Sequence, residues 1–209
     1  MDKDTAIGKF ELDDDMLAAF RQDGVARLRI YIPPNRAVVL GRGSKVDLEI
    51  NVTNCQEDDI PLLRRLGGGC SVFLDEGNVI VSLVAPARGF GRINHYFRLI
   101  SSWLIKGLDQ IGIPDIKQAG VSDLVLGEKK IGGACLYREQ ELVFYSTTLL
   151  VSPQIELMER YLLHPPREPE YRKRRCHRDF VGSLETPSIS SALDLAQELR
   201  SVLTTPVLD

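Results

Sequence analysis

The stretch RRLGGGCSVFLDEGN occupies residues 64–78 and carries the strongest local structural signals of the chain. A glycine triplet separates two short β-prone runs, and the DEGN segment is a typical reverse turn before the apolar run Val79–Val84. Strands joined by a tight turn pair antiparallel, because so short a connection can only reverse the direction of the chain. The stretch therefore predicts a sheet built largely from hairpins.

The segments on either side continue this pattern of strands and turns. Arg27–Ile32 alternates apolar and polar residues, which is typical of a half-buried strand. One long helix is expected around Phe97–Ile111, with Asn94 as its N-cap and Gly112 after its end. Further strands are expected at Val38–Leu40, Leu62–Arg65, Ser71–Leu74, Leu124–Leu126, Ile131–Tyr137 and Leu142–Val151, and further helices at Asp13–Phe20, Ile155–Leu163 and Ala192–Leu203. This order predicts the α+β class with a largely antiparallel sheet flanked by helices, in a single domain over residues 1–209.

The composition is that of a globular protein: 44% of the 209 residues are hydrophobic, 26% are charged and the formal net charge is −3. The longest nearly apolar run, Val79–Ala87, is far shorter than the ~20 residues of a membrane helix, so no membrane segment is expected. The lack of a basic excess argues against nucleic-acid binding. The four cysteines are scattered without a CxxC pair, which argues against structural zinc and favours free thiols in a reducing, cytoplasmic compartment.

Charge is unevenly distributed along the chain. Residues 1–23 carry seven acidic and three basic side chains, whereas residues 167–178 carry six basic and two acidic ones. The two clusters could pair with each other. Alternatively, the basic segment could form a positively charged rim for an anionic ligand or an acidic partner.

Three segments are candidate functional sites. The first is the glycine triplet 67–69 with Arg64 and Arg65 before it, because a backbone without Cβ atoms can turn its N–H groups toward an anion. The second is Lys130, at the start of a glycine-rich strand, which could present an ammonium group to a buried anion. The third is Asp123 before an apolar strand, where it could hold Mg²⁺. Each also has a simpler reading, as a mobile hairpin tip, a solvated lysine or a turn cap.

Taken in order, these segments resemble motifs of the biotin/lipoate A/B protein ligase family, and in particular the catalytic domain of lipoate–protein ligase A. Residues 64–78 resemble the family stretch RRxSGGGAVFHDxGN, and KIGGAC at 130–135 resembles KISGSA. VVLGRG at 38–43 resembles the family's VVIGR strand end, and residues 171–181 resemble a tail of short bacterial members. The resemblance extends from about Phe10 to Leu184.

The resemblance implies the catalytic-domain fold of class II biotin and lipoate ligases and an ATP-dependent reaction. Members activate lipoate, or octanoate, with ATP and Mg²⁺ to acyl-AMP and pyrophosphate, and then pass the acyl group to a lysine of a lipoyl carrier domain. The carrier would be a 2-oxoacid dehydrogenase E2 subunit or a glycine-cleavage H-type protein. The small C-terminal domain of longer ligases is expected to be absent, so a separate accessory subunit is a further expected partner.

The family motifs also assign roles to residues. Lys130 is the expected catalytic cation, because adenylation joins two anionic groups and needs a fixed positive charge. Asp123 is the expected metal ligand. Val72, Val81 and Leu83 are expected to line an apolar tunnel for the acyl chain. Lipoate and the adenylate are expected to bind at Arg64, Arg65, Gly67, Gly68, Gly69, Cys70, Val72, Asn78 and Gly133.

The sequence departs from the family motifs at several positions, which leaves two alternatives open. Gly67 stands where the family has serine, Cys70 replaces the third glycine, Leu74 replaces a histidine, and YSTTLLV at 145–151 replaces HHGTLLL. One alternative is an octanoyl- or lipoyltransferase that works without ATP through a cysteine thioester. Residues 113–121 contain no cysteine where such an enzyme would carry one, although Cys70 lies in the glycine loop. The other alternative is a non-catalytic acyl-binding accessory protein.

Overall fold

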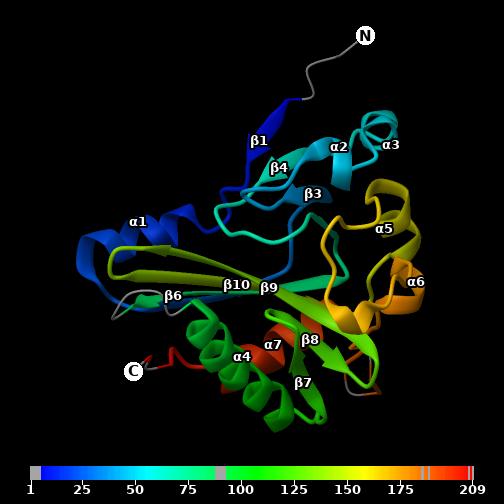
Figure 1. The fold of residues 1–209 in the computed structure, drawn as a ribbon. Coiled ribbons are helices and arrows are strands. Elements are labelled where there is room, and N and C mark those ends of the chain that lie inside the picture. The colour runs from blue at the N-terminus through cyan, green and yellow to red at the C-terminus, as the bar shows by residue number, and fades with distance from the viewer. Residues whose placement is uncertain (1–5, 88–92, 185, 188, 207, 209) are drawn as a thin grey trace.

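The larger of two β-sheets contains six strands in the order β2-β6-β10-β9-β8-β7, and all neighbouring strands are antiparallel (Figure 1). The structure, a computed structural model, describes residues 6–87, 93–184, 186–187, 189–206 and 208. The strands are β2 (Arg27–Tyr31), β6 (Asn78–Pro86), β7 (Ile116–Ala119), β8 (Asp123–Leu126), β9 (Lys129–Glu139) and β10 (Leu142–Leu150). The expected α+β class with a largely antiparallel sheet is therefore confirmed.

A smaller, mixed sheet packs against the larger one above its middle in Figure 1. Its order is β1-β4-β3-β5, with β4 parallel to β1 and β3, and β5 antiparallel to β3. Val39 and Leu74 of this sheet pack against Ile80 of the larger one. The strands are β1 (Ile7–Lys9), β3 (Ala37–Leu40), β4 (Leu62–Arg64) and β5 (Val72–Leu74). The fold thus contains a second layer of strands on one face of the main sheet. The turn after β5 leads from the smaller sheet into β6 of the larger one, so these two strands do not form the hairpin that their short connection predicts.

Helices cover the other face of the larger sheet. The two longest, α4 (Ile93–Gln110) and α7 (Ala192–Val202), contribute Leu104, Leu108 and Leu195 to the largest apolar cluster. None of the described helices is both long and apolar enough to cross a membrane. The remaining helices are α1 (Asp14–Asp23), α2 (Val46–Glu49), α3 (Val52–Glu57), α5 (Ile155–Tyr161), the 3₁₀ helix η1 (Glu170–Arg172) and α6 (His177–Phe180).

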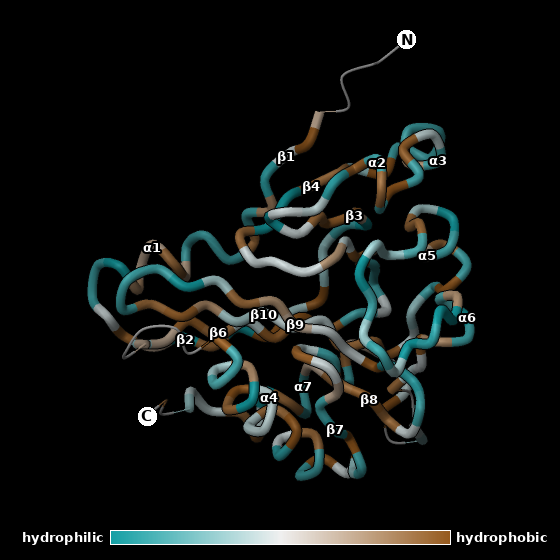
Figure 2. Tube along the Cα trace, viewed as in Figure 1, coloured by the Kyte–Doolittle hydropathy of each residue, from teal (hydrophilic) through white to brown (hydrophobic). Residues whose placement is uncertain are grey.

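Strand β6 is buried on both faces, since every residue from Asn78 to Ala85 is buried, and Figure 2 shows that the strand is largely hydrophobic. Alternate residues point to opposite faces of a strand. Ile80 therefore faces the smaller sheet, whereas Val81 and Leu83 pack in the clusters that face the long helices. This corrects the expected acyl tunnel: Val81 and Leu83 do not line the cavity between the sheets, although Val72 does.

The predicted longer elements are confirmed, with ends that differ by at most four residues. Asn94 lies inside α4, so it is not the N-cap of that helix. The sequence pattern does not predict β1, β7, α2 or α3. These elements have only three to six residues, too few to show a periodicity, and their positions depend on the strands and helices that they contact.

Candidate functional site

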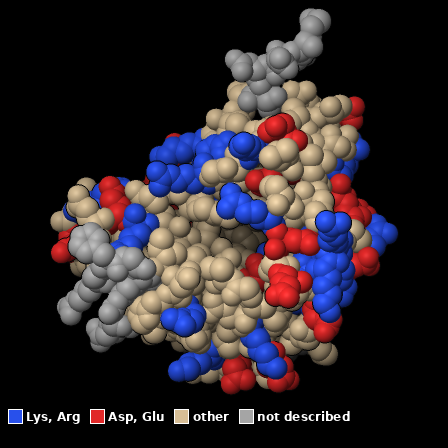
Figure 3. All heavy atoms as spheres, in the orientation of Figure 1, with Lys and Arg blue, Asp and Glu red and all other residues tan. Residues whose placement is uncertain are grey.

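A cavity of about 510 Å³ lies between the two sheets, and Figure 3 shows a hollow in this face between the smaller sheet and strand β9. Small-molecule sites commonly enclose roughly 300–1,000 Å³. One wall comes from β3, β5 and the glycine loop, and the opposite wall comes from β6, β8, β9 and β10. Residues 162–181 close the side between them. We call this last segment the strap.

The glycine loop, which comprises residues 67–70, is held in place through its carbonyl groups. Every carbonyl from residue 67 to residue 70 accepts a hydrogen bond from a group outside the triplet. The bonds run from Arg42 N to Gly67 O (2.9 Å), from Arg65 Nη2 to Gly68 O and Cys70 O (both 2.8 Å), and from Ser44 Oγ to Gly69 O (3.2 Å). The loop is therefore pre-organised, and Gly69 and Cys70 line the cavity.

The two arginines before the loop act as its supports. Arg64 Nη1 donates to the carbonyl oxygens of Gly41 (2.8 Å) and Ser44 (3.1 Å). Arg65 Nη1 donates to Val39 O at 2.9 Å, in addition to its two bonds to the loop. Only Arg65 also lines the cavity. Both guanidinium groups thus fix backbone, and their expected contact with a ligand stays a prediction.

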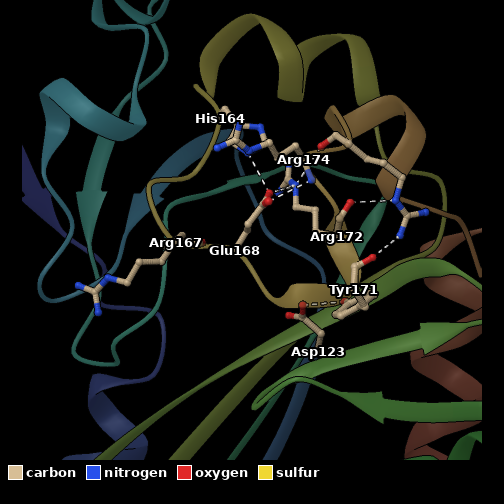
Figure 4. Close-up of polar contacts among 9 residues, drawn as sticks. Asp123, His164, Arg167, Glu168, Tyr171, Arg172 and Arg174 are labelled. Atoms are coloured by element: carbon tan, nitrogen blue, oxygen red, sulfur yellow. Dashed lines mark hydrogen bonds and ion pairs between the residues drawn. The ribbon is translucent and has the colours of Figure 1, made fainter.

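Lys130 and Asp123 form an ion pair on the opposite wall, with Lys130 Nζ 2.7 Å from Asp123 Oδ1. The other carboxylate oxygen, Oδ2, accepts a hydrogen bond of 2.8 Å from the hydroxyl of Tyr171 in the strap, as Figure 4 shows. Burial, followed by the neighbouring carboxylate, raises the pKa of Tyr171 far above its ordinary value. The phenol therefore stays protonated and remains a donor to Asp123.

A β-bulge brings Lys130 to the same side of the sheet as Gly133. Leu124 pairs with Gly132 but Val125 pairs with Lys130, so β9 has one residue more than β8 at this point. Regular alternation would put residues 130 and 133 on opposite faces, and the extra residue removes that difference. A Cβ on Gly133 would lie 2.9 Å from Lys130 Nζ. Glycine therefore leaves the space that the lysine side chain occupies.

The basic segment 167–178 does not pair with the acidic N-terminal segment among the described residues. Acidic groups of residues 6–23 pair instead with Lys9, Arg27 and Arg29. Within the basic segment, Arg172 is buried and Arg175 is half-buried. The exposed members are Arg167, Lys173, Arg174 and Arg178, and Figure 4 shows Arg167 pointing away from the other labelled side chains.

The cysteines are free thiols, as expected. Cys70 and Cys135 line the cavity, and burial raises the pKa of both thiols. Cys70 Sγ also lies 3.5 Å from the carbonyl oxygen of Arg167. Because the thiolate is the nucleophilic form, a raised pKa makes a cysteine a poor acyl carrier. The environment of these thiols is therefore that of structural residues.

Some predicted ligand-binding residues lie outside the cavity lining. Asn78 is fully buried in the turn before β6, where its Oδ1 accepts a hydrogen bond from the N–H of Asp75 at 3.2 Å. The polar side chains of such turns commonly bond to their own backbone, and the motif resemblance does not reveal this role. Gly67, Arg64 and the exposed Gly68 are also outside the lining, whereas Lys130, Asp123 and Gly133 are part of it.

Glu49 is a site residue that the sequence motifs miss. Its carboxylate is buried and accepts hydrogen bonds from Ser44 Oγ (2.9 Å), Ser71 N (2.6 Å) and Ser71 Oγ (2.7 Å). It thereby joins the four-residue helix α2 to the end of the glycine loop. Glu49 carries no local signal, because only the fold brings residues 44 and 71 to it.

A rigid backbone loop and a positioned lysine in one cavity are typical of an enzyme domain that activates an anionic substrate. Comparison with known sequences makes the assignment specific. The profile of the lipoyl protein ligase A/B catalytic domain matches residues 7–198, and the chain belongs to this family. The resemblance of the sequence motifs is thereby confirmed.

Named relatives are similar over most of this chain. A relative from Aeropyrum pernix, provisionally named as a lipoate-protein ligase A, is 29% identical over 160 residues, which cover 71% of this chain and 59% of the relative. A lipoate–protein ligase of Streptococcus pyogenes is 28% identical over 174 residues, which cover 83% of this chain and 47% of the relative. The chain thus spans about half the length of these relatives.

Solved structures share the fold. A structure from a study of a bi-partite lipoate protein ligase and its E2 lipoyl domain from Thermoplasma acidophilum matches with a TM-score of 0.75 and 22% identity. This match covers 93% of this chain and 79% of that one. A lipoate-protein ligase A bound with ATP matches with a TM-score of 0.74 and 22% identity, covering 90% of this chain and 74% of that one.

Gly67 and Cys135 are predicted to compensate for each other. A Cβ on Gly67 would lie 2.6 Å from Cys135 Sγ, and the family motifs have serine and alanine at these two positions. Gly67→Ser should lower the free energy of unfolding by about 1–3 kcal/mol, because it overpacks a buried contact. Adding Cys135→Ala should recover part of that loss, because alanine removes the sulfur but keeps the Cβ of residue 135, which would lie 2.8 Å from the new Cβ. Urea denaturation of the single and double variants measures this coupling.

Gly68→Ser is the matched control, since a Cβ on Gly68 meets nothing within 4 Å. It should leave the free energy of unfolding nearly unchanged. A double variant as unstable as the sum of its single variants would contradict the compensation.

His177 is predicted to make stability depend on pH. Burial, followed by the cation of Arg172, lowers the pKa of His177 from 6.5 to about 4 in the folded protein. The imidazole of the unfolded chain therefore takes up its proton at higher pH than that of the folded protein. Above pH 6.5 His177 does not lower the free energy of unfolding, and it lowers it increasingly as the pH drops from 6.5 toward 4. Urea denaturation of the wild type and of His177→Gln across this window should show a flatter pH profile in the variant. Parallel profiles would contradict the assignment.

Proposed function

We propose that this domain activates lipoate, or octanoate, with ATP and transfers the acyl group to a lysine of a lipoyl carrier domain. In the first step a carboxylate oxygen forms a bond to the α-phosphorus of ATP and pyrophosphate leaves. In the second step the amine of the carrier lysine attacks the acyl carbon, an amide forms, a proton is released and AMP leaves. The observation that carries the proposal is the ammonium group of Lys130, fixed on the wall of a cavity that also holds the glycine loop.

Lys130 suits the first step because the step brings two anions together. A fixed ammonium group lowers the repulsion between the carboxylate and the α-phosphate, and it stabilises the charge that develops in the transition state. The ion pair with Asp123 keeps this group at the cavity wall before any ligand binds. Family membership over residues 7–198 supports the same reaction.

Asp123 is the residue that we propose for Mg²⁺. Magnesium ions are commonly held by one or two carboxylates together with substrate phosphates and water. The described residues contain no group of three or more His, Cys, Asp and Glu side chains that could hold a metal by themselves. Asp123 beside Lys130 fits a site in which phosphates of the nucleotide complete the coordination, and a bound ion would then neutralise phosphate charge there.

The two alternatives find less support. A transferase that works without ATP needs a reactive thiolate, and both thiols that line the cavity have raised pKa values. A non-catalytic acyl-binding protein would need the cavity but not a positioned cation. The bulge, Gly133 and Asp123 all serve to hold Lys130, which favours a catalytic domain.

The proposed partner is a lipoyl carrier domain, of an E2 subunit or of an H-type protein. The similar structure from Thermoplasma acidophilum belongs to a study of a bi-partite ligase and its E2 lipoyl domain. By analogy, we propose that residues 1–209 form one catalytic unit and that a separate accessory subunit completes the enzyme. The exposed side chains of Lys173 and Arg174, on the strap that closes the cavity, suit an acidic carrier.

The activity is tested by incubating the protein with lipoate, Mg-ATP and a lipoyl domain and weighing the carrier by mass spectrometry. A mass increase of one lipoyl group that requires ATP, together with ATP–pyrophosphate exchange that requires lipoate, is the expected result. Transfer from an acyl carrier protein without ATP would instead identify the cysteine-dependent alternative. Lipoate binding without exchange, with or without an accessory subunit, would identify the non-catalytic one.

Lys130→Ala should lower the rate of pyrophosphate exchange by about 10²–10³-fold, the range for removing one pre-organised charge stabiliser. Lys129→Ala is the matched control. Its ammonium group donates to the carbonyl oxygens of Arg178 (3.3 Å) and Asp179 (2.8 Å) at the end of α6, so this variant should lose some thermal stability but keep exchange. Equal losses of exchange in both variants would show that the wrong lysine has been assigned.

The strap is predicted to dock the carrier through Lys173 and Arg174. Arg175 is unsuitable for a charge reversal, because its guanidinium donates to the carbonyl oxygens of Tyr171, Arg172 and Glu128 and so holds the strap. Lys173→Glu with Arg174→Glu should raise the apparent KM for the carrier and weaken its salt dependence, because steering between opposite charges is screened over about 10 Å at 0.1 M salt. Pyrophosphate exchange with free lipoate should persist. Loss of exchange would place these residues in nucleotide binding or folding instead.

A further inference from the structure

Arg172 is a buried cation with an unsatisfied donor on the cavity wall. The residue is 5% exposed, and its Nη2 has no hydrogen-bond partner among the described residues. Burying a charged group without partners is costly, so such groups are usually paired in the interior of a protein. Arg172 lines the same cavity as Lys130. An anion in the cavity would accept the hydrogen bond for which Nη2 of this guanidinium has no partner.

The strap is built to hold this side chain in place. The two residues after Arg172 both have positive φ angles, 52° for Lys173 and 59° for Arg174, a conformation that side chains with a Cβ rarely adopt. Arg172 Nε donates to Arg175 O at 3.0 Å, and Arg175 Nε donates to Arg172 O at 3.0 Å in return. The ring of Phe180 lies 4.7 Å from the guanidinium carbon of Arg172. The turn therefore fixes the direction of the guanidinium before any ligand binds.

The charges around Arg172 leave room for an anion. Glu168 forms an ion pair with Arg172, with its carboxylate 3.6 Å from Arg172 Nε and therefore beyond hydrogen-bond distance. That carboxylate already accepts hydrogen bonds from His164 Nε2 (2.9 Å) and from the N–H of Arg174 (3.0 Å), as Figure 4 shows. Asp123, the acid of the Lys130 ion pair, is likewise shared with the hydroxyl of Tyr171. Both nearby carboxylates are thus engaged by other donors.

We propose that Arg172 is an anion-binding residue that contacts the phosphate groups of the nucleotide, in the same cavity as Lys130. The inference rests on the proposed function for the identity of the nucleotide. A guanidinium group presents planar, paired donors that match the oxygen atoms of a phosphate, and it keeps its charge in a buried position. Tyr171, the preceding residue, donates to Asp123, so the strap brings this cation to the polar part of the cavity. Arg172 would then have two roles: it would bind the nucleotide and it would close the strap over it.

Isothermal titration calorimetry with adenosine, AMP, ATP and inorganic pyrophosphate tests the proposal on Arg172→Gln and Arg172→Lys. Arg172→Gln should weaken ATP binding by about 10–100-fold, the loss expected for a hydrogen bond between charged groups. Adenosine binding should stay within about twofold, and Arg172→Lys should weaken ATP binding less because it keeps the charge. Arg178→Gln is the control: its side chain is exposed on the same strap, so ATP binding should not change.

The nucleotides locate the contact. Equal weakening of AMP and ATP would support a contact with the α-phosphate, whereas weakening of ATP and pyrophosphate alone would support a contact with the outer phosphates. Unchanged ATP binding in Arg172→Gln, or equal weakening of adenosine and ATP, would overturn the proposal. If neither variant of Arg172 folds, the residue is structural and the proposal fails. A wild type that binds pyrophosphate through Arg172 but does not bind ATP would overturn the proposed function and leave the anion site standing.

Discussion

The ion pair between Lys130 and Asp123 is the interaction around which the site is arranged. It exists because a bulge in β9 puts Lys130 on the cavity side and because Gly133 leaves the space beneath the ammonium group. The backbone of Lys130 also holds the strap, since its carbonyl accepts the N–H of Gly182 at 2.8 Å and it pairs with Val181. One residue thus joins the main sheet, the cavity and the segment that closes the cavity.

The opposite wall is stabilised in a different way, by guanidinium groups that donate hydrogen bonds to backbone carbonyl oxygens. Arg64 and Arg65 each donate to several carbonyl oxygens, and Arg175 does the same for the strap. A guanidinium group whose N–H groups donate to carbonyl oxygens holds the backbone in place and has few donors left for a ligand. Arg65 and Arg172 each have one buried nitrogen atom without a hydrogen-bond partner. In Arg65 this atom is Nε, and both terminal nitrogens donate to carbonyl oxygens, whereas in Arg172 it is the terminal Nη2. Arginine residues therefore have different roles in this site, and the partners of each guanidinium group in the fold distinguish these roles.

The substitution of family residues in this chain has a local physical explanation at one pair of positions. Gly67 and Cys135 lie on facing elements, and a side chain larger than glycine at 67 would overlap the sulfur of Cys135. From the sequence, the serine that Gly67 replaces is one of the lost family residues that leave alternative functions open. The structure shows instead that Gly67 lies behind the cavity lining and that its small size makes room for a neighbour.

The sequence by itself determined the long elements, the α+β class and the family, because periodic apolar patterns and ordered glycine and charge motifs are local properties of the chain. It also proposed Lys130, Asp123 and the glycine loop as candidate site residues, and in the fold Lys130, Asp123 and part of the loop line one cavity. It did not determine the second sheet, the partners of Arg64 and Arg65, or the sides of β6 on which Val81 and Leu83 lie. Those features depend on contacts between residues far apart in the chain: Glu49 reaches Ser71, and Tyr171 reaches Asp123. Only the tertiary structure decided them, since whether a charged side chain braces backbone or faces a ligand depends on which atoms surround it after folding.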